Sequence, residues 1–234
     1  MAKQKRTIVG ENLTPTLLRE LGAVDKFPRT PADFQPNGNW VNKYRIWTCH
    51  GYRESGNENV GSLRITRRVD SKKTFFLEVR QEIVQTDEMT NVIEGTIRCR
   101  KNQLASPVEW KLSSRFEGPE GKVISELGCR NHGVATESAI GTAGDWCLFE
   151  AVQRLAFDKR SSLKFDLLEG MSLSKLGHRL FYRRAYPMKT DGQSIPLHCF
   201  GQLGSGILPY EYWLDNHHRL LAVISMNKAY VLDQ

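Results

Sequence analysis

Apolar and polar residues alternate at a spacing of two through much of this sequence, and that pattern constrains the fold most strongly. Residues 206–230, GILPYEYWLDNHHRLLAVISMNKAY, contain two such segments joined by a short polar turn, and a third follows. Successive side chains of a β-strand point to opposite faces, so this spacing predicts strands. We therefore expect consecutive antiparallel strands at the C-terminal end.

The same pattern begins near residue 43 and continues along the chain. Gly, Asn, Asp, Pro and Ser separate the apolar segments at distances typical of hairpins. In 107–116, for example, Trp110, Leu112 and Phe116 share one face of the predicted strand. We expect strands over 43–52, 61–69, 73–84, 91–100, 107–116, 122–129, 133–140, 163–171, 178–188, 194–202, 207–215, 219–226 and 229–233.

One segment departs from this pattern and predicts a helix over about 145–157, DWCLFEAVQRLAF. At 100° per residue its apolar residues form one stripe that includes Leu148 and Val152, whereas Glu150 and Arg154 fall on the opposite face. Thr142 or Asp145 is expected to cap its N-terminus. A helix with such a stripe should pack on the sheet.

The expected fold is therefore mainly β: a long antiparallel sheet curled into a barrel or half-barrel, with one main internal helix packed on it. Residues 43–234 should form this single barrel-like domain. Residues 1–42 differ from the rest, and within them 27–40 are rich in Pro, Asn and Gly, so we expect an N-terminal arm with a short helix over 12–21. Curling brings the edges of a long sheet together and protects them from aggregation.

Composition excludes several classes of protein. Hydrophobic residues make up 40% of the 234 residues, and no apolar run reaches the roughly 18 residues of a membrane helix. The N-terminus shows no apolar core of a secretory signal, so we expect a cytoplasmic location, with export as the alternative. The net charge of +7 favours acidic partners, but the basic residues are dispersed and no nucleic-acid motif is recognisable.

Neither catalytic nor metal-binding residues can be assigned, and no cofactor is expected. The five cysteines are widely spaced, which favours reduced, buried thiols. His217 and His218 are adjacent in a predicted turn and point apart, which disfavours joint metal binding. The sequence Gly-Ser-Gly at 204–206 lacks the flanking pattern of a nucleophile elbow and is better explained as a loop between strands.

Aromatic residues provide the candidate ligand-binding site. They concentrate in the C-terminal half with arginines among them, and strands such as 219–226 are apolar on both faces. Each face needs cover, either from packed side chains or from a ligand. For an apolar or amphipathic small molecule or lipid, the candidate binding residues are Phe181, Arg183, Tyr210, Tyr212, Trp213 and Trp146.

Three segments resemble uncharacterised bacterial β-barrel domains of the LolA-like kind. They are VGSLRITRR at 60–68, the helical DWCLFEAVQRL at 145–155, and LPYEYWLDNHHRLLAV at 208–223. The resemblance covers about residues 43–234 and implies a curved, incomplete antiparallel barrel partly plugged by helices. It also implies a periplasmic lipid carrier, although the exported members of that group carry a leader that is not seen here.

Three functions remain open at this point. The first is a non-enzymatic protein that binds an apolar or amphipathic ligand, or a protein partner, in its concave face. The second is a hydrolase or other small-molecule enzyme, which would require His178, His198, Glu211 and Arg183 to meet in one pocket. The third is a structural or interaction module that uses a basic surface.

Overall fold

The computed structural model describes residues 27–49, 57–86, 88–134, 140–158, 160, 162–190 and 193–233. For residues 126–132, 134, 189–190 and 193–195 the description covers the backbone only. The helix predicted over 12–21 lies outside the described residues, as does part of the strand predicted over 133–140.

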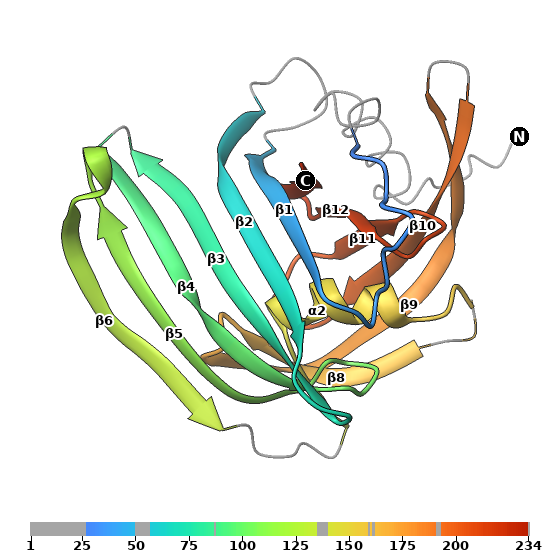
Figure 1. Ribbon diagram of the computed structural model, residues 1–234, viewed down its shortest axis with the longest axis horizontal. Coiled ribbons are helices and arrows are strands. Elements are labelled where there is room, and N and C mark those ends of the chain that lie inside the picture. The colour runs from blue at the N-terminus through green and yellow to red at the C-terminus, as the bar shows by residue number, and fades with distance from the viewer. Residues whose placement is uncertain are drawn as a thin grey trace, which may run out of the picture.

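The described residues form one 13-stranded sheet whose strand order is β6-β5-β4-β3-β2-β1-β13-β12-β11-β10-β9-β8-β7. Figure 1 shows this sheet curling around a short central helix. The strands are β1 (Trp40–Thr48), β2 (Glu58–Val69), β3 (Thr74–Thr86), β4 (Met89–Arg100), β5 (Pro107–Glu117), β6 (Val123–Val134), β7 (Thr142–Gly144), β8 (Ser162–Glu169), β9 (Leu173–Thr190), β10 (Gln193–Leu203), β11 (Tyr210–Leu214), β12 (Leu220–Ile224) and β13 (Lys228–Leu232).

Neighbouring strands are antiparallel with one exception, β7 and β8. The helix α2 (Asp145–Ala151) connects these two strands, and such a crossover allows the chain to return in the same direction. Strands β6 and β7 end the sheet on its two sides and are not paired with each other, so the barrel does not close. The prediction of a mainly β fold with a curled antiparallel sheet is confirmed.

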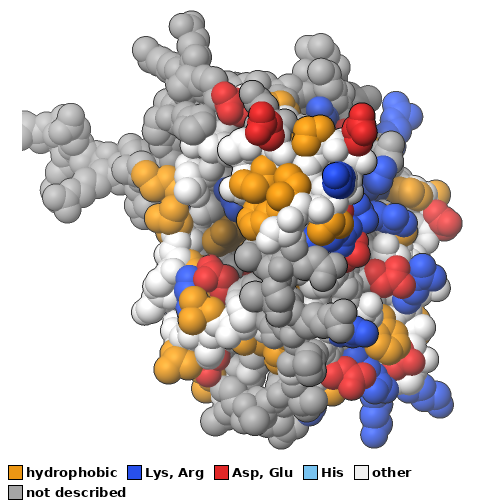
Figure 2. Space-filling model, turned by 90° about the vertical axis from the view of Figure 1, so that its left-hand side faces the viewer, with side chains coloured by type: hydrophobic (Ala, Val, Ile, Leu, Met, Phe, Trp, Pro, Cys, Tyr) orange, Lys and Arg blue, Asp and Glu red, His pale blue; other side chains and the backbone are white. Residues whose placement is uncertain are grey.

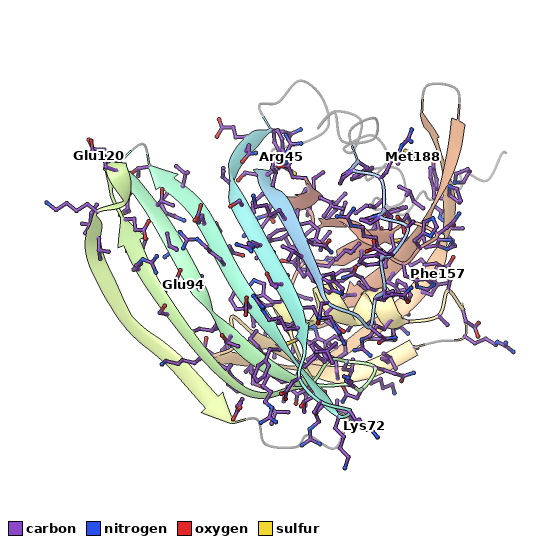
Figure 3. The ribbon with its side chains drawn as sticks, in the orientation of Figure 1. Arg45, Lys72, Glu94, Glu120, Phe157 and Met188 are labelled. Carbon is purple, nitrogen blue, oxygen red and sulfur yellow. The ribbon has the colours of Figure 1, made fainter. Side chains whose placement is uncertain are left out.

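Several register shifts bend the strands around the helix. They occur between Cys199 and Phe200 of β10 and between Trp213 and Leu214 of β11, among others. Such bulges increase the local twist of a sheet. Figure 3 shows side chains filling the space around α2 between β1 and β9, with Phe157 beside the helix.

The helix occupies the predicted place but is shorter and more deeply buried than expected. A 3₁₀ turn, η2 (Val152–Arg154), follows it, and every residue from Trp146 to Ala151 is buried. The predicted caps are wrong, because the N-cap residue is Gly144, which has no side chain to accept a capping hydrogen bond, while Thr142 belongs to β7. A second short 3₁₀ turn, η1 (Pro119–Gly121), joins β5 to β6.

The helix face that carries Glu150 was expected to be polar and opposite the sheet, and this is a second correction. The sheet surrounds the helix, so Glu150 is fully buried and meets Arg67 of β2, with 2.8 Å between Nε and Oε1. Arg154 donates to both carboxylate oxygens, at 2.7 and 2.8 Å. Arg67 also donates to the carbonyls of Asn37 and Gly38. The buried Glu150 carboxylate thus links α2 to strand β2 of the sheet.

Residues 27–39 form no strand or helix and lie against the barrel. Phe27 and Phe34 pack on the core. Thr30 donates a hydrogen bond to Asp215 in the β11–β12 turn, and the Arg29 carbonyl accepts one from Arg219. Within the described residues, no helix has the length and apolar character needed to cross a membrane.

Candidate ligand cavity

A cavity of about 250 Å³ lies between the N-terminal part of α2 and the inner faces of surrounding strands. Its lining comes from segments far apart in the sequence, including β3, β4, β8, β11 and β13. The lining residues are Gln81, Ile93, Asp145, Trp146, Phe149, Leu167, Glu169, Gly170, Gln202, Ile207, Tyr210, Tyr212, Lys228 and Tyr230.

Strand register explains why tyrosines gather in this cavity. Tyr210 and Tyr212 are two residues apart in β11 and therefore share a face. Val223 of β12 pairs with Tyr212 on one side and with Tyr230 of β13 on the other, which extends the same row across three strands. The row faces inward, toward α2.

Phe149 anchors this aromatic row to the helix. Its ring makes edge-to-face contacts with Tyr230 at 5.3 Å, with Tyr44 of β1 at 5.5 Å and with Tyr212 at 6.2 Å between centroids. Edge-to-face packing is a favoured aromatic geometry. The contacts position the rings of Tyr212 and Tyr230, so the cavity has an aromatic wall.

Polar groups also line the cavity. The Tyr212 hydroxyl donates to Gln202 Oε1 at 2.7 Å. Burial raises the pKa of Tyr212 well above its usual value, and it likewise raises the pKa values of Tyr210 and Tyr230. All three phenols therefore stay protonated near neutral pH and can both donate and accept hydrogen bonds.

Asp145 places a carboxylate beside the aromatic row. Its Oδ1 accepts from the Trp146 N–H and its Oδ2 from the Gly170 N–H, each at 3.0 Å. Gly170 and Met171 both adopt positive φ, 55° and 58°, and this tight β8–β9 turn directs the Gly170 N–H at the carboxylate. Desolvation raises the pKa of Asp145 to about 6 despite these hydrogen bonds, and the nearby Glu169 adds to the increase.

Three of the six predicted ligand-binding residues lie in this cavity: Trp146, Tyr210 and Tyr212. The other three lie on the opposite face of the sheet, because Trp213 and Glu211 alternate with Tyr212 along β11. Arg183 forms an ion pair with Glu211. A Cβ placed on Gly201 would lie 3.1 Å from both Phe181 and Arg183, so these two side chains cross over that glycine.

The residues of the predicted enzyme alternative have separate surroundings. His198 bonds to Tyr182 and to Asn216, each at 2.9 Å, and its ring stacks on Phe157. His178 is buried near Gln202. Arg183 and Glu211 pair on the other side of the sheet. The geometry does not bring these four side chains into one catalytic group.

Histidine and cysteine positions also bear on metal binding. In the described part of the chain, no group of three or more His, Cys, Asp or Glu side chains is placed to hold a metal ion. Four cysteines are buried and free, as predicted for Cys99 and Cys147, whose sulfur atoms lie 3.7 Å apart. The side chain of Cys129 lies outside the described residues.

The convex surface of β2–β5 carries many basic residues, but they alternate with acidic ones. Figure 2 shows Lys and Arg side chains interspersed with Asp and Glu on one flank of the molecule. Arg80 pairs with Glu82 and Glu94, at 2.7 and 3.0 Å, and Arg115 pairs with Glu94 and Glu117, at 2.8 and 2.6 Å. This neutralisation disfavours a binding surface for a polyanion on these strands.

Several residues of the cavity were not predicted as binding residues. Tyr230 follows the alternation of its strand, so its side could be predicted, but its position opposite Tyr212 depends on pairing through β12. Asp145 was interpreted as a helix cap because the sequence does not show that the β8–β9 turn meets it. Glu169 of β8 also lines the cavity.

Comparisons with known proteins support the fold. No protein-family model matches the sequence, and no curated protein matches it. Among solved structures, the chain is similar to the β-barrel-like protein of domain of unknown function DUF1849 from Brucella abortus. The TM-score is 0.52 at 8% sequence identity, over 83% of this chain and 95% of that one. The likeness shows a β-barrel-like fold and does not distinguish the LolA-like group from other such proteins.

Proposed function

We propose that this protein binds a small amphipathic organic molecule in the cavity between α2 and β11–β13. The observation that carries this proposal is a cavity lined by a row of tyrosine rings, with their hydroxyl groups and the Asp145 carboxylate among the lining groups. Concave sites with mostly apolar walls and a few polar groups are typical of small-molecule binding.

The size of the cavity favours a small ligand. Pockets for drug-sized molecules have volumes of roughly 300–1,000 Å³. The volume here is about 250 Å³, because side chains such as Phe149 and Leu167 fill the space nearby. A compact molecule, or the head of a longer one, fits this space better than a complete two-chain lipid. The lipid-carrier role implied by the LolA-like resemblance is therefore the less favoured form of this proposal.

A neutral fluorescent probe tests whether the cavity takes up apolar molecules. N-phenyl-1-naphthylamine should bind the wild-type protein with increased fluorescence and saturation at one site. Native mass spectrometry after incubation with an extract of small organic molecules should show a ligand-bound mass. Absence of both probe binding and any bound mass would refute the proposal.

Two adjacent residues in the β10–β11 loop provide a matched pair of variants. Ile207 lines the cavity, whereas Leu208 does not contribute to the lining and is 43% exposed. Ile207→Trp should fill the cavity and abolish probe binding, whereas Leu208→Trp should leave binding unchanged. Equal probe binding by the two variants would show that the probe binds elsewhere.

A further inference from the structure

The charge in the cavity indicates what kind of ligand it suits. Asp145 has an ionisable carboxyl at the cavity wall, and in the described part of the chain it forms no ion pair with Lys or Arg. Its two hydrogen bonds come from backbone N–H groups, which leave carboxylate lone pairs available. A carboxylate withdrawn from water is stabilised when a cation approaches it.

The aromatic row beside Asp145 has the complementary property. Tyr210, Tyr212 and Tyr230 line the same cavity as Trp146. Aromatic faces carry negative electrostatic potential, and several such faces around one space bind ammonium groups. Their phenol oxygens also accept hydrogen bonds, so they can hold a primary amine as well as a quaternary one.

Other charged groups near the cavity weaken its preference for a cation without reversing it. Glu169 on β8 lies 2.7 Å from the Lys175 ammonium of β9, so these two charges offset each other. Lys228, at the start of β13, lines the cavity and disfavours a cation. Its long side chain is partly exposed and can carry its charge toward water. His178 lies near Gln202 and has Lys175, Asp166 and Glu169 as charged neighbours.

We propose that the natural ligand carries an ammonium group, which sits against the tyrosine rings with its charge facing Asp145, and an apolar body that extends along Trp146 and Phe149. This inference rests on the proposed function and specifies its ligand class. A neutral or anionic ligand would leave the Asp145 carboxylate without a counter-charge.

Choline and its neutral isostere 3,3-dimethylbutan-1-ol isolate the contribution of charge, because they differ in shape very little. Isothermal titration should show that choline binds about tenfold tighter than the isostere at pH 7.5, which corresponds to about 1.4 kcal/mol. Lys228→Gln should strengthen choline binding, because it removes a repelling charge. Tyr230→Leu should weaken choline binding more than isostere binding.

The pH dependence provides a test that needs no variant. With a pKa of about 6, Asp145 is mostly ionised at pH 7.5 and about one-tenth ionised at pH 5. Because the ionised form should bind choline about tenfold tighter, choline affinity should fall about fivefold between these values, while isostere affinity stays nearly constant. Asp145→Asn should remove this dependence.

The outcomes separate the two proposals. If choline and the isostere bind equally at pH 7.5 while N-phenyl-1-naphthylamine still binds in the cavity, the ammonium inference is refuted and the proposed function stands. If choline affinity does not change between pH 5 and pH 7.5, the role of Asp145 is refuted. If the wild-type protein binds neither the naphthylamine nor choline and shows no ligand-bound mass, the proposed function and this inference are both refuted.

Discussion

Glu150→Gln should destabilise the fold strongly, because it leaves buried positive charge without a counter-charge. Arg67 and Glu150 are both fully buried, 2.8 Å apart, and Arg154 is only 10% exposed. Glutamine has nearly the same shape as glutamate, so packing around α2 is preserved. The variant therefore measures the charge of Glu150 rather than its volume.

The magnitude follows from the surroundings of Arg67. At an effective dielectric constant of about 20, two unit charges at 2.8 Å attract by about 6 kcal/mol before desolvation is considered. Removing one partner of a buried pair typically costs about 3–5 kcal/mol. Arg67 retains hydrogen bonds to the carbonyls of Asn37 and Gly38 and lies 4.3 Å from the Phe75 ring centroid, so we expect about 3 kcal/mol.

Urea denaturation followed by tryptophan fluorescence measures this loss, and for a chain of this size it corresponds to a fall of about 6–12 °C in Tm. Glu82→Gln is the matched control, because Glu82 pairs with Arg80 at 2.7 Å but both side chains are well exposed, and the expected cost is below about 1 kcal/mol. The double variant Arg67→Met/Glu150→Gln should lose less stability than Glu150→Gln alone. Equal, small losses for Glu150→Gln and Glu82→Gln would refute the reasoning.

Three further predictions concern a buried leucine, two buried thiols and the titration of His218. Leu148→Asp should lower the free energy of unfolding by about 3 kcal/mol or more, since it buries an unpaired charge. Leu176→Asp, at a 67% exposed site, should change that free energy by less than about 0.5 kcal/mol. The midpoints of urea denaturation compare the two variants. The thiols of Cys99 and Cys147 should resist iodoacetamide until the protein unfolds, because both are fully buried and burial raises the pKa of Cys99. Rapid labelling of the native protein, detected by mass spectrometry, would contradict this prediction. Burial lowers the pKa of His218 below 6.5, so the folded protein prefers the neutral ring, and the stability that His218 contributes should fall as pH drops below 6.5. The Tm values of wild type and His218→Asn should therefore converge toward acid pH. A constant difference in Tm would exclude this role.

The sequence alone determined where the strands lie. Alternation and turn residues depend on neighbours in the chain, so the predicted segments match the observed strands to within a few residues for most of the sheet. The same periodicity explains why Tyr210 and Tyr212 share one face of β11, although the predicted site also included Trp213 of the opposite face. The apolar stripe around Leu148 also located the helix α2.

Only the tertiary structure decided how these elements enclose space. A helical pattern with Glu150 opposite the apolar stripe is typical of a helix exposed on one side, and the sequence does not show that Arg67, 83 positions earlier, meets it inside a curled sheet. The cavity likewise depends on contacts between segments that are distant in the sequence. Asp145 meets Gly170, and Tyr212 and Tyr230 flank Val223, because bulges and strand pairing bring distant segments together. Local periodicity fixes the face of a side chain, whereas the curvature of the whole sheet fixes what that face meets.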